Sequence, residues 1–344
     1  MHSQTENPIP ENSLIQERVD KVFLGEPAIH GQMAMYPLLD KEDSAANYLT
    51  LDESICKGYA HITEIDQSGN VPELKFKNIS DKRIFLMEGE ELLGAKQNRT
   101  LNLSILAPAE KEIIIPVTCV ESGRWSYDSE RFNSSDRVHF SKGRREKMES
   151  VSCSMCIDNS ARADQGAVWE EISSKALRMK TFSSTNSMGD IFEKHKYRLS
   201  DYVKAFNAIE NQAGMLVMVG DDITGLDLFS NKHTLKKLMP KLVRSFALDA
   251  IELNTNKQYQ PRVEHAEDLL GKATTAMASF HKGIGDGINL RLQNETVIGG
   301  ALALDKQVIH LSAFRKEGRT GPGSYRRNRE SSVRRASHRR GYRR

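Results

Sequence analysis

The stretch that predicts the fold most directly is residues 100–120, which read TLNLSILAPAEKEIIIPVTCV. Apolar and polar residues alternate over 100–106, and a β-branched run covers 112–120. Alternation is typical of a strand with one buried face, and β-branched residues favour strands. Because residues 108–111, Pro-Ala-Glu-Lys, interrupt the two segments, we expect a turn between two strands of an antiparallel sheet.

Similar short segments lie on both sides of this pair. Upstream, strands are expected at residues 58–65, 74–79 and 83–87, separated by turn-forming Asp, Asn, Ser and Gly residues. This spacing favours a β-rich, antiparallel, sandwich-like N-terminal lobe over residues 18–125. Downstream, the apolar period becomes helical, which indicates a mixed lobe at residues 165–314. Since no βαβ unit repeats, the pattern predicts an α+β fold.

The C-terminal lobe is expected to combine helices and strands. Ser187 and Asn231 suit helix N-caps, and Pro240 is expected to kink the helix that Asn231 begins. The expected helices are 165–179, 187–206, 231–250 and 263–281, and the expected strands are 215–219, 223–229, 288–292, 297–304 and 308–314.

Three segments lack clear periodicity. Residues 1–17 are expected to be a flexible lead-in, and residues 126–164, rich in Ser and Arg, a polar loop region. Residues 315–344 hold 12 Lys and Arg against two acids, so we expect a disordered basic tail. Since the whole chain carries +3, the remainder is net −7. This balance argues against a nucleic-acid-binding core and predicts only weak, salt-dependent polyanion binding by the tail.

The composition is that of a globular, cytoplasmic protein. Hydrophobic residues make up 38% and charged residues 28% of the 344 positions. No apolar run approaches the ~18 residues that cross a bilayer, and the polar N-terminal stretch lacks a secretory signal pattern. Four cysteines in this length predict no disulfide framework. We therefore expect no membrane partner, while the oligomeric state stays open.

Charged residues gather at strand ends between residues 83 and 125. Paired strands end near each other and glycines permit tight turns, so we expect these side chains to share one rim. Cations on such a rim suit an anion, with Arg giving bidentate contacts, and Trp125 suits stacking on a planar ring. The alternative is a surface salt-bridge network that caps a sheet edge. The rim candidates are Glu90, Lys96, Arg99, Glu121, Arg124 and Trp125.

The remaining motifs carry weaker signals. Cys153 and Cys156 form a lone C-x-x-C without a second ligand pair, so we expect incidental loop thiols and no metal. Residues 283–287, GIGDG, follow an expected helix rather than a strand, which favours a helix C-cap over a dinucleotide site. His310 lies in an apolar strand and is expected to be a hydrogen-bonded core histidine. We therefore expect no cofactor.

Three stretches carry a family resemblance: EGE and GAKQNR within residues 88–99, IPVTCVESGRW at 115–125, and DQ and VWEEI within 164–172. Together they resemble the ARG and rhodanese-phosphatase-superfamily-associated protein family, an uncharacterised and mostly prokaryotic family in which ARG denotes ADP-ribosylglycohydrolase. The similarity makes residues 18–314 the family domain. Ser122 stands where the family pattern has Gln, and Asn98 where Asp is also common.

The resemblance implies, by association alone, a link to ADP-ribose or NAD metabolism in prokaryotic conflict systems. From the matching stretches we add Gln97, Gln165 and Trp169 to the ligand-binding candidates. Our main hypothesis is a protein that binds or processes a phosphorylated, nucleotide-like ligand. Glu90 or Glu121 would be the general acid or base if it is an enzyme, which the sequence leaves open. The alternative is a non-catalytic interaction or structural protein whose charged rim is an inter-lobe salt-bridge network.

Overall fold

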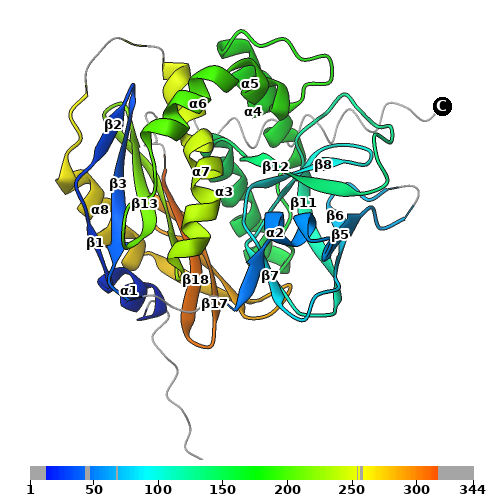
Figure 1. Ribbon diagram of the computed structural model, residues 1–344, viewed down its shortest axis with the longest axis horizontal. Coiled ribbons are helices and arrows are strands. Elements are labelled where there is room, and N and C mark those ends of the chain that lie inside the picture. The colour runs from blue at the N-terminus through cyan, green and yellow to red at the C-terminus, as the bar shows by residue number, and fades with distance from the viewer. Residues whose placement is uncertain (1–12, 43–46, 67–68, 254, 256–258, 317–344) are drawn as a thin grey trace, which may run out of the picture.

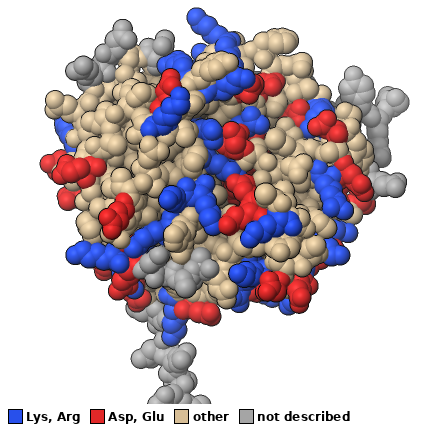
Figure 2. Space-filling view, in the orientation of Figure 1, with Lys and Arg blue, Asp and Glu red and all other residues tan. Residues whose placement is uncertain are grey.

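The computed structural model describes residues 13–42, 47–66, 69–253, 255 and 259–316. Helices and antiparallel sheets are combined without βαβ repeats, so the predicted α+β class is confirmed. The helices α3 and α7 run through the middle of the molecule, with one large sheet on one side and two smaller sheets on the other (Figure 1). Acidic and basic side chains are interspersed over the visible face (Figure 2). No helix in the described ranges is long and apolar enough to cross a bilayer.

The large sheet has nine strands in the order β1-β3-β13-β14-β18-β17-β16-β15, with β2 also paired to β3. Helices cover both faces, because α7 packs on β13 while α1 and α8 pack on β18 and β17. Apolar residues therefore run almost continuously along its central strands. The strands are β1 (Val22–Leu24), β2 (Ala28–His30), β3 (Met33–Asp40), β13 (Gln212–Val219), β14 (Asp222–Phe229), β15 (Met277–Lys282), β16 (Ile288–Gln293), β17 (Val297–Leu304) and β18 (Gln307–Arg315).

The N-terminal lobe consists of two smaller sheets that enclose a shared apolar core. The six-stranded sheet has the order β12-β8-β9-β11-β6-β5, and the three-stranded sheet has the order β10-β7-β4. This arrangement agrees with the predicted sandwich-like lobe, although β4 and β7 are parallel. The strands are β4 (Tyr48–Thr50), β5 (Ala60–Thr63), β6 (Glu73–Asn78), β7 (Arg83–Leu86), β8 (Glu90–Gly94), β9 (Arg99–Leu101), β10 (Ile105–Ala107), β11 (Glu112–Cys119) and β12 (Phe132–Val138).

The predicted boundary between the lobes is wrong in one respect. Strands β1 to β3 precede the N-terminal sandwich in sequence, yet they belong to the large sheet, where Tyr36 pairs with Leu216. This pairing joins segments far apart in the sequence, which local periodicity does not reveal. The predicted strand at 100–106 also divides, because β9 pairs with β11 while β10 pairs with β7.

The predicted polar loop at 126–164 is instead largely ordered, with β12 followed by the helix α3 (Ser141–Asp158). The buried face of α3 carries Arg144 and Lys147 beside Met148 and Val151. Charged side chains on the buried face interrupt the apolar period, so the helix could not be recognised from its hydrophobic pattern.

The other helices mostly follow the predicted pattern. Ser187 accepts a hydrogen bond from the Gly189 N–H, and the Asn231 carboxamide accepts one from the Thr234 N–H, so both predicted caps are confirmed. The expected helix at 187–206 is two helices. The remaining bounds are α1 (Ser13–Asp20), α2 (Leu51–Cys56), α4 (Gln165–Arg178), α5 (Met188–Lys194), α6 (Lys196–Ala205), α7 (Lys232–Leu253) and α8 (Val263–Thr274).

Three boundary predictions need correction. Residues 13–17 of the expected lead-in belong to α1, which buries Leu14 and Ile15. The helix expected at 263–281 ends at Thr274 and β15 follows, so the glycines at 283–287 connect two strands rather than capping a helix. Arg315 ends β18, and the Lys316 N–H donates to the Thr296 carbonyl. The rest of the predicted lead-in and tail lies outside the described residues.

Candidate functional site

A polar cluster lies at one end of the six-stranded sheet; we call it the Arg99 cluster. Cys119 of β11 pairs directly with Arg99 of β9, which brings the segments that follow and precede these strands together. The end of β5 contributes Glu64, and α4 contributes Gln165 and Trp169. The cluster comprises Glu64, Lys96, Gln97, Arg99, Cys119, Glu121, Arg124, Trp125, Gln165 and Trp169.

Arg124 uses all its hydrogen-bonding capacity on the protein itself. Its Nη1 donates to the carbonyls of Ala95 (2.8 Å) and Ser126 (3.1 Å). Its Nε and Nη2 lie 3.0 and 2.8 Å from Oε2 of Glu121, and Nη2 also donates to Asn98 (3.1 Å). These contacts occupy the five N–H donors of a guanidinium. Arg124 and Glu121 thus fix the loop geometry, and the contacts do not favour the predicted anion-binding role of Arg124.

Arg99 is different, because it is fully buried and keeps unused donors. Its Nη1 donates to the backbone carbonyl (3.2 Å) and Oε1 (3.1 Å) of Gln97, whereas Nε and Nη2 have no hydrogen-bond partner. Oε1 of Glu64 lies 3.9 Å from Nη2, and neither oxygen of that carboxylate is hydrogen-bonded. Burial lowers the pKa of Arg99, while the adjacent Cys119 side chain, which contacts the guanidinium, and the charge of Glu64 oppose the shift. Such unpaired buried groups each cost about 1–3 kcal/mol.

Cys119 lies at the back of the cluster. Its Sγ is 3.0 Å from both Oε1 of Gln97 and the Glu121 carbonyl, and burial raises the pKa of the thiol, opposed by Arg99. Gln165 holds the Cys119 backbone from both sides, accepting from its N–H and donating to its carbonyl, each at 2.8 Å. The buried indole N–H of Trp169 lies against the Cys119 thiol and lowers its pKa, although it meets no acceptor in good hydrogen-bond geometry. Gln165 and Trp169 are therefore positioning residues around Cys119.

Trp125 supplies an aromatic surface at the outer side of the cluster. Its side chain is 48% exposed, and the Arg99 guanidinium carbon lies 5.8 Å from its ring. The Lys96 ammonium lies 5.2 Å from the same ring and 5.1 Å from the ring of Tyr127. Two cations therefore lie within cation–π range of one half-exposed indole, so positive charge gathers beside an aromatic surface.

Glu90 does not belong to this cluster. Its carboxylate accepts from the Lys241 ammonium (2.9 Å) and from the Met87 N–H (2.8 Å), and Lys241 also binds Asp52. Burial raises the pKa of Glu90, Lys241 opposes this, and the charge of Asp52 adds to it. The expectation that Glu90 shares the rim is wrong, because it points toward α7. Conversely, sequence reasoning missed Glu64, whose position near the end of the predicted strand 58–65 was its only signal.

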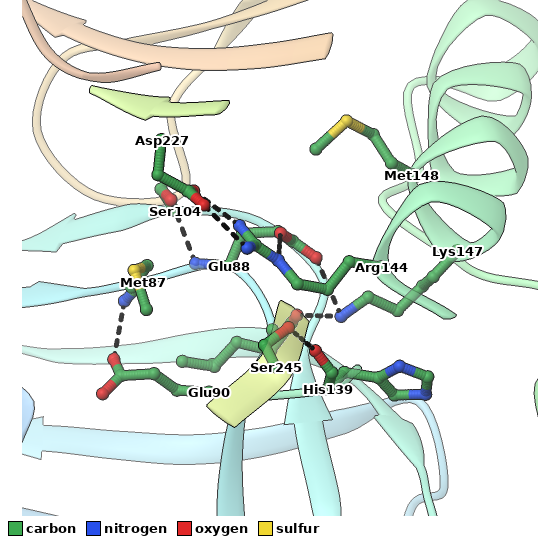
Figure 3. Close-up of polar contacts among 12 residues, drawn as sticks. Met87, Glu88, Glu90, Ser104, His139, Arg144, Lys147, Met148, Asp227 and Ser245 are labelled. Carbon is green, nitrogen blue, oxygen red and sulfur yellow. Dashed lines mark hydrogen bonds and ion pairs between the residues drawn. The ribbon is translucent and has the colours of Figure 1, made fainter. Parts of the chain in front are cut away.

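A second polar network joins the two lobes, and we call it the inter-lobe network (Figure 3). Arg144 of α3 binds Asp227 of β14 with two hydrogen bonds (2.9 and 2.7 Å) and Glu88 with a third (3.1 Å). Lys147 lies 3.2 Å from Glu88. Burial alone would raise the pKa of the Glu88 and Asp227 carboxyls. Lys147 and Arg144 instead hold the pKa of Glu88 below its ordinary value, and Arg144 does the same for Asp227.

Ser104, His310 and Asp227 within this network have the composition of a catalytic triad. Ser104 Oγ lies 2.8 Å from Nδ1 of His310, and Nε2 of His310 lies 3.2 Å from Asp227. All three are buried, Arg144 already neutralises Asp227, and Ser104 Oγ also accepts the Glu88 N–H. A nucleophile needs a substrate within reach and a base free to take its proton. These contacts favour a structural role, and the prediction that His310 is a hydrogen-bonded core residue is confirmed.

Cavities occur elsewhere in the molecule. One of about 440 Å³ lies where α3 begins, lined by Lys142, Arg178 and Asp249. A groove of about 1260 Å³ runs along α3 from Arg145 to Ile157. Cys153 and Cys156 line this groove from a helix, not from the predicted loop. Within the described ranges, no three Cys, His, Asp or Glu side chains form a metal-binding group.

Comparison with known proteins identifies the family. The ARG and Rhodanese-Phosphatase-superfamily-associated Protein domain matches residues 21–314, and the chain belongs to this family. No curated protein and no solved structure matches the chain. The match covers both lobes and contains the Arg99 cluster and the inter-lobe network, whose residues all lie within it.

Proposed function

We propose that this member of the family binds a phosphorylated, nucleotide-like ligand at the Arg99 cluster. The observation that carries the proposal is the Arg99 guanidinium, which is fully buried while Nε and Nη2 have no hydrogen-bond partner. These two atoms form the edge of a guanidinium that binds an oxyanion with two parallel hydrogen bonds. A phosphate at this edge would satisfy donors that the protein leaves unpaired.

The neighbouring groups support a nucleotide-like ligand over a free phosphate. Glu64 offers two carboxylate oxygens without hydrogen-bond partners, which suit the hydroxyl donors of a ribose. Trp125 offers a half-exposed ring face for a base. The name of the family records an association with ADP-ribosylglycohydrolases and phosphatases, which is consistent with ADP-ribose or NAD as the ligand class.

We propose binding rather than a reaction as the primary role. Both predicted acid–base residues are engaged by cations, Glu90 by Lys241 and Glu121 by Arg124. A general acid or base must reach the proton that it transfers. Glu64 is the carboxylate of the cluster whose oxygens remain available, and we assign it to hydrogen bonding with the ligand.

Ligand-dependent thermal stabilisation tests this proposal. We expect ADP-ribose or NAD to raise the melting temperature of the full-length protein, because a ligand that binds only the folded state adds about 2.7 kcal/mol at 100 times its Kd. Glu64→Gln is nearly isosteric and should reduce the shift, and Arg99→Gln should remove it. Arg198→Gln, an exposed change on α6, is the matched control and should leave the shift unchanged. No shift with either ligand, or equal shifts in all variants, would contradict the proposal.

The alternative function is a non-catalytic scaffold, and the inter-lobe network favours it. Arg144 links Glu88 of the N-terminal lobe to Asp227 of the large sheet, so the lobes are joined by buried charges. We expected the charged rim to join the two lobes, whereas the inter-lobe network consists of other residues. A scaffold predicts no stabilisation by nucleotides, so the same thermal measurement separates the two functions.

A further inference from the structure

The groove along α3 contains a buried cation that the proposed function does not use. Arg291 of β16 lines this groove of about 1260 Å³ together with Cys153 and Cys156 of α3 and Met277 and Ser279 of β15. A volume of this size exceeds the roughly 300–1000 Å³ of typical small-molecule sites. The groove and the Arg99 cluster have no lining residue in common.

Arg291 is 4% exposed, and no carboxylate among the described residues lies within ion-pair distance of it. The charge of Glu88 opposes the burial that lowers the pKa of Arg291, but Glu88 is itself bound by Arg144 and Lys147. Its Nε donates to the Ser152 hydroxyl (2.9 Å) and its Nη2 to the Met148 carbonyl (3.3 Å), which leaves three of its five donors unused. Two other buried arginines differ, because Arg144 binds Asp227 and Arg18 binds Asp40. Buried charges are normally paired, so a guanidinium without a carboxylate partner in a cavity wall is a candidate anion-binding group.

The backbone around Arg291 makes room for its guanidinium. Gly300 pairs with Arg291 on β17, and a Cβ at Gly300 would lie 2.3 Å from Nη1. Ser279 pairs with Arg291 on the other side, from β15. Any larger residue at position 300 would displace the guanidinium, so the sequence at this position preserves its placement in the groove wall.

We propose that the groove is a second ligand site, in which Arg291 binds the oxyanion group of a small polar molecule. Arg145 and Lys316 line the same groove and add positive charge. Glu146, Glu149 and Glu295 also line it. Because these carboxylates repel a large anion, the ligand carries one compact phosphate or carboxylate at Arg291 and hydrogen-bond donors elsewhere. This site is independent of the proposed function of the Arg99 cluster.

His281 of β15 provides a local reporter for this site. Burial lowers the pKa of His281, and the positive charge of Arg291 lowers it further. The ring otherwise contacts the Ser279 hydroxyl and the Asn159 carboxamide, which are uncharged. An anion bound to Arg291 cancels the positive charge, so the pKa of His281 rises toward its ordinary value when the site is filled.

The test is an NMR titration of the histidine rings in the full-length protein at constant ionic strength, with inorganic phosphate, acetate or chloride, and with His281→Gln to assign the signal. We expect phosphate, acetate or both to raise the pKa of His281 relative to chloride. The anion that raises this pKa shows whether Arg291 binds a phosphate or a carboxylate. Arg291→Gln should remove the rise and weaken binding roughly tenfold or more, since charge-assisted hydrogen bonds are lost.

Two comparisons make the outcome decisive. Arg99→Gln should leave the His281 response intact, which separates this site from the Arg99 cluster. An unchanged His281 pKa in the wild-type protein, with phosphate and with acetate, would overturn the proposal without recourse to any variant. The same rise in Arg291→Gln would also overturn it, because the anion would then bind elsewhere.

Discussion

At the scale of single residues, the two arginines of the predicted rim have opposite roles. Arg124 directs all its donors to Glu121, Asn98 and backbone carbonyls, whereas Arg99 leaves Nε and Nη2 without partners. Both arginines lie near the ends of paired strands, so the sequence pattern does not distinguish their roles. The distinction matters because a saturated guanidinium stabilises a loop, while an unsaturated buried one has capacity for a ligand.

Arg124→Gln should therefore reduce stability rather than binding. The loop from Glu121 to Ser126 loses its central hydrogen-bond donor, and we expect the free energy of unfolding to fall by about 1–3 kcal/mol. Chemical denaturation measures the loss, and ligand titration of the same variant should give a Kd close to that of the wild type. A strongly weakened Kd with unchanged stability would reverse our assignment of Arg124.

The sequence predicted those contacts between residues that follow from the pairing of two strands close together in the chain. The pairing of β9 with β11 places the segments around Arg99 and Glu121 together, and alternation over 100–106 and the β-branched run over 112–120 predicted the two strands. Glu64 was missed because β5 reaches the cluster only through the strand order β9-β11-β6-β5, which is set by long-range pairing. The partners of a guanidinium also depend on side-chain geometry that a sequence does not contain.

At the scale of elements, α3 is the least predictable helix, and its start is completed by another helix. Its preceding residue, Phe140, provides no side-chain cap, and Asp249 of α7 serves instead by accepting the Lys142 N–H (2.9 Å) and the Ser141 hydroxyl. Asp249 also binds the buried ammonium of Lys175 in α4. One carboxylate thus ties three helices together, and a cap from a distant helix leaves no local sequence signal.

Asp249→Asn should destabilise the protein by about 2–3 kcal/mol, because removing one partner of a buried ion pair leaves the other charge poorly compensated. Because Glu252 still binds Lys175, the loss of stability should be smaller than if Lys175 had no carboxylate partner. Ser141→Ala is the matched control and should cost only about 1 kcal/mol, since it removes one hydrogen bond. Equal losses in the two variants, measured by denaturant unfolding, would show that the ion pair contributes nothing beyond the cap.

At the scale of the whole molecule, buried charge joins the lobes. Glu88 and Asp227 both have a pKa below the ordinary value, held there by Lys147 and Arg144. Carboxyls of this kind contribute stability above their unfolded pKa of roughly 4, and the contribution is lost as pH falls through the folded pKa. The large sheet combines β1–β3 from the N-terminal end of the family domain with β13–β18 from its C-terminal half, so both ends of the domain belong to one sheet.

Acid unfolding tests this whole-molecule contribution. In the wild-type protein the free energy of unfolding should fall below about pH 4 as Asp227 is protonated. Burial lowers the pKa of His139 to about 3, so this histidine binds a proton more readily in the unfolded state than in the folded state. The protein therefore also loses stability in acid through His139, starting near the ordinary histidine pKa of 6.5. The informative quantity is therefore the difference between wild type and Asp227→Asn, which should be large at pH 7 and shrink below pH 4. A difference that does not depend on pH would show that the charge of Asp227 is unimportant.

The measurement that tests the central claim most directly is calorimetric titration of ADP-ribose into the wild-type protein, Arg99→Lys and Glu64→Gln. Lysine keeps the charge but lacks the two-donor edge, so it isolates the bidentate contact that we assign to Nε and Nη2 of Arg99. We predict saturable binding to the wild type, roughly tenfold weaker binding to Arg99→Lys, and weaker binding to Glu64→Gln. Absence of binding to the wild type, or identical affinities in all three proteins, would contradict a ligand site at the Arg99 cluster.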